Sequence, residues 1–245
     1  MERQIFLLRT MSDTVETDIH RVHVIANEVL SRYRKAALTW EELRKIADGP
    51  FDLFLIPLIF PEEFSTDPRN VFNEARRQEI RSHALEIARA HGFDTQPPEL
   101  FRGVEEPLRA AEEAGLRNVL LTTGGRRFQH QAMERHGIGR YFHDIIDREQ
   151  TYFTKEQGIY YLFRKMSLPE TRVVLLSGTA SYIRAGANLK SCKVGASELS
   201  VRTVALATRY SYSDEHTLSA TGPDLLIHDL DELVPRLKGA GWLDA

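Results

Sequence analysis

The residues of this chain that could do chemistry follow short apolar runs, and most of them are hydroxyls or cations. Thr122, Thr123, Gly124 and Gly125 stand between an apolar run and a helical pattern. Backbone N–H groups at the start of a helix, next to a hydroxyl, can bind an anion. Similar positions are occupied by Arg9 with Thr10, Asp147 with Lys155 downstream, Ser177 to Ala180, and Thr208 to Tyr210. The pattern favours a local site for a small anion.

Carboxylates are scarce at these positions. No Asp or Glu lies between Glu2 and Asp13, and none lies between Glu170 and Glu198. The second interval instead holds the cations Arg172, Arg184, Lys190 and Lys193. Since Mg²⁺ in proteins is held through carboxylates and phosphate oxygens, neither interval supplies a carboxylate that could hold this ion.

Two further groups of residues are typical metal ligands or nucleophiles. His20 and His23, with Glu16 before them, have a spacing that places them on one face of a helix. We interpret them as a polar helix face. The single cysteine, Cys192, excludes an internal disulfide and a cysteine-based metal cluster, and we expect it to be structural.

Composition excludes several classes of protein. The 245 residues include 32 Lys and Arg against 35 Asp and Glu, for a formal net charge of -3, so no global basic field would hold nucleic acid. The longest apolar run, 53–60, is interrupted by Pro57 and is far shorter than the roughly 20 residues that cross a bilayer. We therefore expect no nucleic acid partner, no membrane segment and a cytoplasmic location.

The elements before residue 100 form a strand and then a helical module. Ile5 to Leu8 is a short continuous apolar run that predicts a buried strand. Apolar residues at helical spacing follow from Asp18, a capping box at Thr39 and Glu42 opens a second helix, and Asp67-Pro68 opens a third that stops at Gly92. We therefore predict an all-helical domain over residues 15–97.

The rest of the chain alternates between strands and helices. Strands are predicted at 118–121, 144–147, 172–176, 202–207 and 224–227, with helices between them and a last helix at 231–237. This order predicts an α/β core with a doubly wound parallel sheet, formed by residues 1–14 and 98–245. Ligands of such sheets bind at the carboxyl ends of the strands, where the residues named above stand.

Together these segments resemble the haloacid dehalogenase superfamily, in particular phosphoglycolate-phosphatase-like members with a helical cap. The similarity rests on GLRNVLLTTGG, which ends in the hydroxyl of Thr122, on Lys155 in TKEQGIYY, and on VLLSGT at 174–179. The resemblance implies a Rossmann-like core with an inserted cap, which here is the helical domain. In the family, the lysine balances the charge on the phosphoryl group.

The family's chemistry also requires an aspartate nucleophile after the first strand and a second carboxylate two residues later. In this sequence those two positions fall on Leu7 and Arg9, or on Phe6 and Leu8. The magnesium-binding aspartates fall on Thr179 and on Tyr182, Ile183 or Cys192. The resemblance therefore implies degenerate catalytic motifs, with no catalytic residue and weak or absent Mg²⁺.

The anion-binding half of the site is retained. We predict that Thr122, Thr123, Gly124 and Lys155 bind an anion, with Arg9 and Arg126 as further cations. The favoured hypothesis is a pseudophosphatase that binds a phosphorylated small molecule, or a protein partner or second copy, without hydrolysis. One alternative is an active phosphatase that recruits Glu16, Asp18 or Asp147. Another is a non-catalytic scaffold or assembly subunit.

Overall fold

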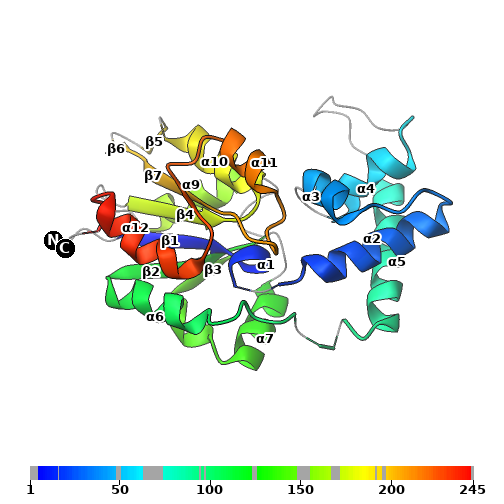
Figure 1. The fold of residues 1–245 in the computed structure, drawn as a ribbon, viewed down its shortest axis with the longest axis horizontal. Helices are drawn as coiled ribbons and strands as arrows, with labels where there is room; N and C mark the ends of the chain where they lie inside the picture. Colours follow the sequence, from blue (N-terminus) through cyan, green and yellow to red (C-terminus); the bar gives the residue numbers. More distant parts are fainter. Residues whose placement is uncertain are drawn as a thin grey trace.

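A computed structural model describes residues 5–15, 17–47, 51–62, 74–93, 95–96, 98–122, 126–147, 155–166, 172–190, 192–194 and 197–243. Figure 1 shows two regions, a sheet with helices on both faces and a separate group of helices beside it. The sheet region contains both the first and the last described residues. The helical group is therefore an insertion into the α/β region.

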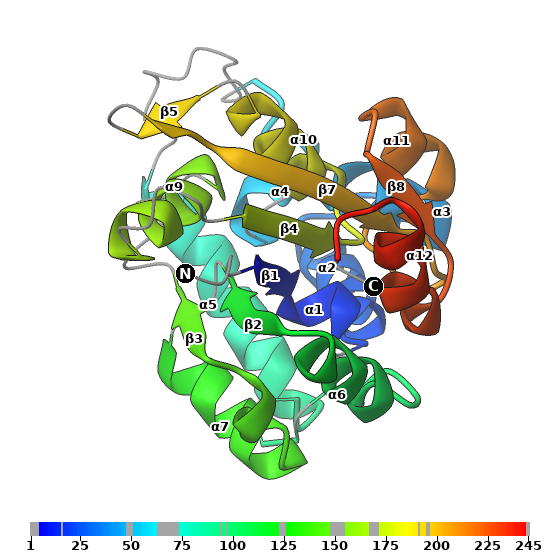
Figure 2. The ribbon, with the colours of Figure 1, turned by 90° about the vertical axis from the view of Figure 1, so that its left-hand side faces the viewer.

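The sheet has six parallel strands in the order β3-β2-β1-β4-β7-β8 (Figure 2). They are β1 (Ile5–Thr10), β2 (Leu116–Leu121), β3 (Asp144–Ile146), β4 (Arg172–Ser177), β7 (Ser200–Leu206) and β8 (Leu225–Ile227). The chain adds β2 and β3 on one side of β1, and then β4, β7 and β8 on the other. The order therefore reverses between β1 and β4, which is where ligands bind in such sheets.

These strands confirm the predicted doubly wound α/β core, with changes at the strand ends. β1 continues two residues beyond the predicted Ile5 to Leu8, because Arg9 and Thr10 still pair with Leu120 and Leu121 of β2. A small antiparallel pair, β5 (Lys193–Val194) and β6 (Ser197–Glu198), was not predicted. Its strands of two residues are too short to show an alternating pattern.

Helices cover both faces of the sheet because each central strand is apolar on both sides. Leu7, Leu120 and Val174 pack with residues of α6 (Glu105–Glu113), α7 (Arg126–His136) and α12 (Leu233–Gly239). On the opposite face, Phe6 and Val173 pack with residues of α9 (Lys155–Met166) and α10 (Ala180–Leu189). The shorter helical elements are α1 (Met11–Thr14), η1 (Gly139–Tyr141), α11 (Glu215–Ala220) and η2 (Leu230–Glu232).

The helical insertion contains α2 (Ile19–Arg32), α3 (Trp40–Ile46), α4 (Phe51–Ile59) and α5 (Glu74–Ala90). These helices share a hydrophobic cluster that includes Leu30, Leu43, Leu55 and Ile80. The capping box predicted at Thr39 and Glu42 is present, whereas Asp67-Pro68 lies outside the described residues. The structure therefore confirms a helical insertion, and the exact boundaries 15–97 stay a prediction.

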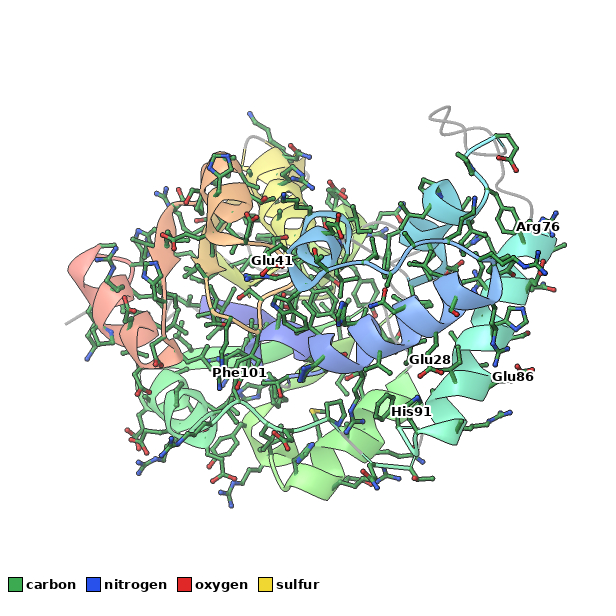
Figure 3. All side chains as sticks on the ribbon, turned by 45° about the vertical axis from the view of Figure 1, so that its right-hand side comes forward. Glu28, Glu41, Arg76, Glu86, His91 and Phe101 are labelled. Carbon is green, nitrogen blue, oxygen red and sulfur yellow. The ribbon has the colours of Figure 1, made fainter. Side chains whose placement is uncertain are left out.

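The insertion joins the sheet region through two chain segments that run side by side. The Thr17 N–H donates to the carbonyl of Glu99 at 2.8 Å, and the Phe101 N–H donates to the carbonyl of Val15 at 2.9 Å. We call the segments marked by Val15 and Thr17 and by residues 99–101 the hinge. Figure 3 shows Phe101 on the side of the hinge that faces the sheet region, far from His91, which pairs with Glu28 within the insertion.

Among the described residues, no helix has the length and apolar character that a bilayer crossing requires.

Candidate functional site

Asp13 is the central residue at the point where the strand order reverses. It follows β1 in the short helix α1, and its side chain is 1% exposed. Thr10 donates to Oδ1, while Thr179 donates to Oδ2 at 2.6 Å and Ser177 donates to the same oxygen at 3.3 Å. The backbone N–H of Gly178 also donates to this carboxyl group. We call Asp13 with Thr10, Ser177 and Thr179 the Asp13 cluster.

The cluster is closed around its carboxyl group. Burial raises the pKa of Asp13, and the hydrogen bonds from Thr10, Thr179, Ser177 and Gly178 oppose that rise without cancelling it. Both carboxyl oxygens accept hydrogen bonds from within the cluster. The Asp13 side chain therefore links the ends of β1 and β4, and its carboxyl group is buried with both oxygens engaged in these bonds.

Asp13 is the acidic residue nearest to the end of β1, and the sequence analysis did not single it out as a site residue. Because β1 extends to Thr10, both pairs of positions considered for the family's carboxylates lie inside the strand. Leu7 and Phe6 are each 0% exposed and pack on opposite faces of the sheet. The residue that ends β1 is Thr10, and the nearest following acid is Asp13.

The positions compared with the family's magnesium-binding aspartates have other roles. The Thr179 hydroxyl belongs to the Asp13 cluster, and Tyr182 lies under the Lys155 ammonium group. A Cβ atom on Gly178 would lie 2.6 Å from Ser211 Oγ and 2.8 Å from Ser211 Cβ. A side chain at Gly178 is therefore excluded by Ser211.

The structure places Thr122 and Lys155 at the same carboxyl edge of the sheet. Thr122 directly follows β2, is 7% exposed, and accepts a 3.4 Å hydrogen bond from Gln129 Nε2. Lys155 begins α9, donates to Ser181 and lies 4.3 Å from the centre of the Tyr182 ring. Thr123 and Gly124 lie outside the described residues, as does the side chain of Arg126, the first residue of α7.

Arg9 does not reach this edge. Its side chain is 0% exposed and points to the face of the sheet that α6 covers. Arg9 Nε donates to Asn118 Oδ1 at 3.0 Å, Nη2 donates to the carbonyl of Pro107 at 3.4 Å, and the buried Nη1 has no partner among the described residues. Burial lowers the pKa of Arg9 to about 9. The prediction that Arg9 adds a cation to the anion site is wrong, because alternation along β1 turns its side chain into the core.

The structure also shows where two of the three carboxylates considered for an active phosphatase lie. Asp18 accepts a 2.7 Å hydrogen bond from the Tyr212 hydroxyl, and Asp147 is 0% exposed directly after β3. Glu16 lies outside the described residues. His23 Nε2 lies 2.8 Å from the carbonyl of Leu38, and the rings of His20 and His23 both pack near Trp40. These contacts agree with a polar helix face.

The resemblance to the family raises the question of a magnesium ion, and the described donors around Asp13 do not fit one. Mg²⁺ requires nearly octahedral oxygen ligands with carboxylates among them. The Asp13 carboxyl group instead accepts hydrogen bonds from three hydroxyls and an N–H group. Within the described part of the chain, no three His, Cys, Asp or Glu side chains gather as a metal site would require.

Arg44 is a residue of the site region that the sequence did not indicate. It lies on α3 of the insertion and reaches the loop after β7. Its Nε donates to the carbonyl of Ser211 at 2.9 Å, and Nη2 donates to the carbonyls of Thr208 at 3.1 Å and Ser213 at 2.9 Å. The Ser213 N–H donates in turn to the carbonyl of Gly178 at 2.9 Å. Arg44 therefore connects the insertion to the loop that supports the Asp13 cluster.

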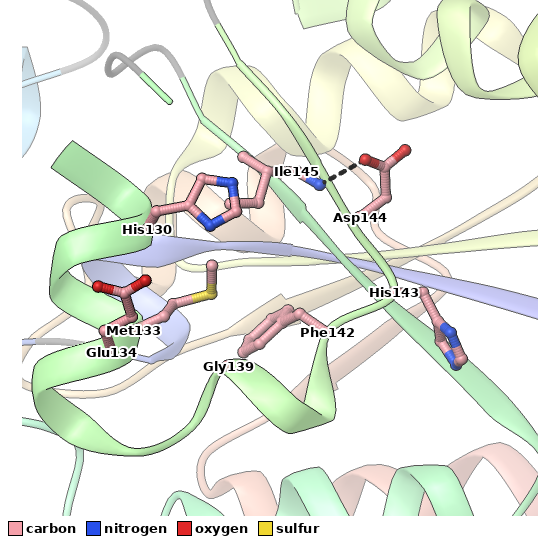
Figure 4. A pocket seen from close by; sticks show the side chains of 8 residues that line it. All are labelled: His130, Met133, Glu134, Gly139, Phe142, His143, Asp144 and Ile145. Carbon is pink, nitrogen blue, oxygen red and sulfur yellow. Dashed lines mark hydrogen bonds between the residues drawn. The ribbon is translucent and has the colours of Figure 1, made fainter. Parts of the chain in front are cut away.

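A small cavity of about 170 Å³ lies at the other end of β3. Figure 4 shows its lining residues, which come from α7, η1 and the start of β3 and include His130, Glu134 and His143. Asp144 turns back to accept a hydrogen bond from the N–H of Ile145 at 2.9 Å. This cavity contains none of the predicted site residues and lies at the amino end of its strand.

Comparison with known proteins supports the resemblance seen in the sequence. A phosphoglycolate phosphatase from Photobacterium profundum is 24% identical over 141 residues, which are 57% of this chain and 56% of that protein. A phosphoglycolate phosphatase from Vibrio parahaemolyticus is 23% identical over 137 residues. The matched region thus spans little more than half the length of these curated relatives. No family model matches the chain.

Solved structures show the same fold over nearly the whole chain. A predicted phosphatase from Clostridium acetobutylicum has a TM-score of 0.71 at 14% identity, covering 97% of this chain and 100% of that structure. A haloacid dehalogenase-like family hydrolase from Streptococcus pneumoniae has a TM-score of 0.71 at 13% identity, with the same coverage. The chain therefore has a haloacid dehalogenase-like fold. Its resemblance to that superfamily, of the phosphoglycolate-phosphatase-like type, is confirmed.

Proposed function

We propose that this chain binds a phosphorylated small molecule at the carboxyl edge of its sheet and does not form an aspartyl-phosphate. The Thr122 hydroxyl, the Lys155 ammonium group and the N-terminus of α7 would hold the phosphate. Lys155 and Thr122 both lie at strand or helix ends that face this edge. The likeness to phosphatases supports a phosphorylated small molecule as the ligand.

The closed Asp13 cluster is the observation that carries this proposal. Phosphoryl transfer to a carboxylate requires an oxygen lone pair directed at the phosphorus atom. The Asp13 carboxyl group is buried, and both of its oxygens accept hydrogen bonds from Thr10, Ser177 or Thr179. Opening the cluster would leave several buried polar groups unpaired, at a cost of roughly 1–3 kcal/mol for each group.

Hydrolysis is a second candidate function, and the relatives support it better than they support binding alone, since the curated ones are phosphatases. The Thr10 hydroxyl donates to Asp13, as a hydroxyl nucleophile does to its general base. In this reaction Asp13 takes the Thr10 proton and Thr10 Oγ1 bonds to phosphorus. The ester bond breaks, and the leaving alkoxide takes the proton from Asp13. Water then hydrolyses the threonyl phosphate and releases inorganic phosphate.

One experiment separates the two candidates. The full chain is incubated with a panel of phosphomonoesters that includes 2-phosphoglycolate, with Mg²⁺ and with EDTA, and phosphate release and thermal stability are both measured. Binding without hydrolysis predicts that at least one compound raises the melting temperature while no phosphate is released. The Lys155→Ala variant should lose this stabilisation. Lys165→Ala, which changes a lysine on the same helix that pairs with Asp144, is the matched control.

The other outcomes are equally specific. Phosphate release that survives EDTA and is lost in Thr10→Val would establish hydrolysis through Thr10 and overturn the binding proposal. Release that EDTA abolishes would overturn both mechanisms. If no compound stabilises the chain or is cleaved, the chain does not bind this ligand class. The predicted scaffold role would then be favoured.

A protein partner, a homodimer and a cytoplasmic location remain proposals that rest on the sequence. The single Cys192, which leaves no partner for an internal disulfide, agrees with a reducing intracellular compartment. Size-exclusion chromatography with light scattering would test the homodimer directly.

A further inference from the structure

A larger cavity, of about 470 Å³, opens at the carboxyl ends of β7 and β8 beside the hinge. Thr17 and Glu99 of the hinge form one wall, and the residues after β7 and β8, Tyr210 and Asp231 among them, form another. We call this space the hinge cavity. It contains no residue of the Asp13 cluster, and neither Thr122 nor Lys155 lines it. Any ligand it holds is therefore bound outside the proposed phosphate site.

One side of the hinge cavity is suited to an aromatic ring. Phe101 and Tyr210 both line the cavity, and their rings meet edge to face with centroids 5.4 Å apart. Pro107 and Leu230, which also line it, are buried. Aromatic pairs prefer this geometry, and a third ring can add to such a pair by stacking or by a further edge contact.

The rim of the hinge cavity carries both signs of charge. Arg102, Glu99 and Asp231 are exposed lining residues whose charged groups have no partner among the described residues. The Arg9 guanidinium lies behind the cavity wall, because its Nη2 donates to the carbonyl of the lining residue Pro107 at 3.4 Å. Arg209 is a further exposed lining residue, and its guanidinium lies 4.6 Å from the centre of the Tyr210 ring. A positive region at Arg102 and Arg209 therefore accompanies a negative region at Glu99 and Asp231.

We propose that the hinge cavity binds a small aromatic zwitterion of the aromatic amino acid class. The ring packs against Phe101 and Tyr210, the carboxylate pairs with Arg102, and the ammonium group pairs with Asp231 and Glu99. A ligand with a single charge would leave one part of the rim uncompensated.

Calorimetric titration of the full chain tests this proposal with three probes that share one ring. They are L-phenylalanine, 3-phenylpropanoate, which lacks the ammonium group, and phenethylamine, which lacks the carboxylate. We expect L-phenylalanine to bind and each single-charge probe to bind at least about tenfold more weakly. The Arg102→Ala and Asp231→Asn variants should each weaken L-phenylalanine binding by a similar factor. Both residues are exposed, so the variants should fold.

Two controls keep the result specific. Arg109→Ala changes an exposed arginine of α6 that does not line the cavity, and it should leave binding unchanged. Lys155→Ala should also leave binding unchanged, so this test is independent of the proposed phosphate site. The proposal is wrong if L-phenylalanine fails to bind at millimolar concentration, if either single-charge probe binds equally well, or if binding survives both Arg102→Ala and Asp231→Asn.

Discussion

The Thr179 hydroxyl donates a 2.6 Å hydrogen bond to Asp13 Oδ2, although the two residues are 166 positions apart in the chain. This bond joins the loop after β4 to the helix after β1. It closes the space between the two strands where a doubly wound sheet normally receives a ligand. In the proposed binding function, the phosphate therefore lies toward Thr122 and Lys155.

The first prediction concerns the Asp13 carboxyl group and pH. Because burial raises its pKa in the folded state, the folded chain holds the Asp13 proton more tightly than the unfolded chain does. Asp13 should therefore reduce stability as pH rises from the ordinary carboxyl pKa of about 4 toward its raised value. Denaturant unfolding of the wild type and of Asp13→Asn should be measured from pH 4 to 8. As pH rises over this range, the free energy of unfolding of the variant should increase relative to that of the wild type.

Asp13→Ala provides the complementary measurement. This variant leaves the buried hydroxyls of Thr10 and Thr179 without their acceptor and should cost roughly 1–3 kcal/mol of unfolding free energy. For the first variant, Asp13→Asn, the opposite result is also defined. If its free energy of unfolding changes with pH in parallel with that of the wild type, the pKa of Asp13 is unchanged by folding.

The second prediction concerns the close approach of Gly178 and Ser211. Because a Cβ atom on Gly178 would lie 2.6 Å from Ser211 Oγ, Gly178→Ala should destabilise the fold by about 1–3 kcal/mol. Ser211→Gly in the same chain should recover much of this loss, and a double-mutant cycle measures the recovery. Gly139→Ala, whose Cβ would meet its nearest atom at 3.9 Å, is the control and should be almost neutral.

The third prediction concerns the buried cation of Arg9. Its Nη1 is buried without a partner among the described residues, and desolvation of the guanidinium opposes folding. Replacing it by an apolar side chain of similar length, Arg9→Met, should raise the unfolding free energy by about 1 kcal/mol or more. Thermal and denaturant unfolding should both show the increase. A large loss of stability would mean that the bond to Asn118 outweighs the cost of burial.

The fourth prediction concerns the attachment of the helical insertion. Arg44→Ala removes three hydrogen bonds to the carbonyls of residues 208, 211 and 213. We expect a loss of roughly 2–4 kcal/mol, since hydrogen bonds from charged groups contribute about 1.5–3 kcal/mol each and are not additive. Hydrogen exchange should become faster in the loop after β7. Arg32→Ala, which breaks an exposed pair with Glu86, should cost less than about 1 kcal/mol and leave that loop unchanged.

The sheet and the helical insertion could be predicted from the sequence because their signals are local. Continuous apolar runs mark strands that are buried on both faces, and the helical spacing after Asp18 marks α2. The end of β1 could not be predicted in this way. Arg9 interrupts the apolar run and therefore looked like the strand's end, although it lies inside the strand and under α6.

The Asp13 cluster and the Arg44 contacts depend on residues that are far apart in the chain. Asp13 meets Ser177 and Thr179, and Arg44 meets carbonyls more than 160 positions away. Every residue has a backbone carbonyl, so the sequence cannot indicate which carbonyls accept hydrogen bonds from Arg44. The hydroxyls of Thr10 and Thr179 were visible at the strand ends, but only the pairing of β1 with β4 brings them to one carboxyl group.

The two hydrogen-bonded segments of the hinge also bear on how the helical insertion could be exchanged. The N–H groups of Thr17 and Phe101 bond to the opposite segment, so the insertion leaves the sheet region beside the place where it enters. Its helices pack around a hydrophobic cluster of their own, to which Tyr212 contributes from the loop after β7. A different helical module could be grafted between the same two segments without any change in strand register, so the insertion can be exchanged while the α/β scaffold persists.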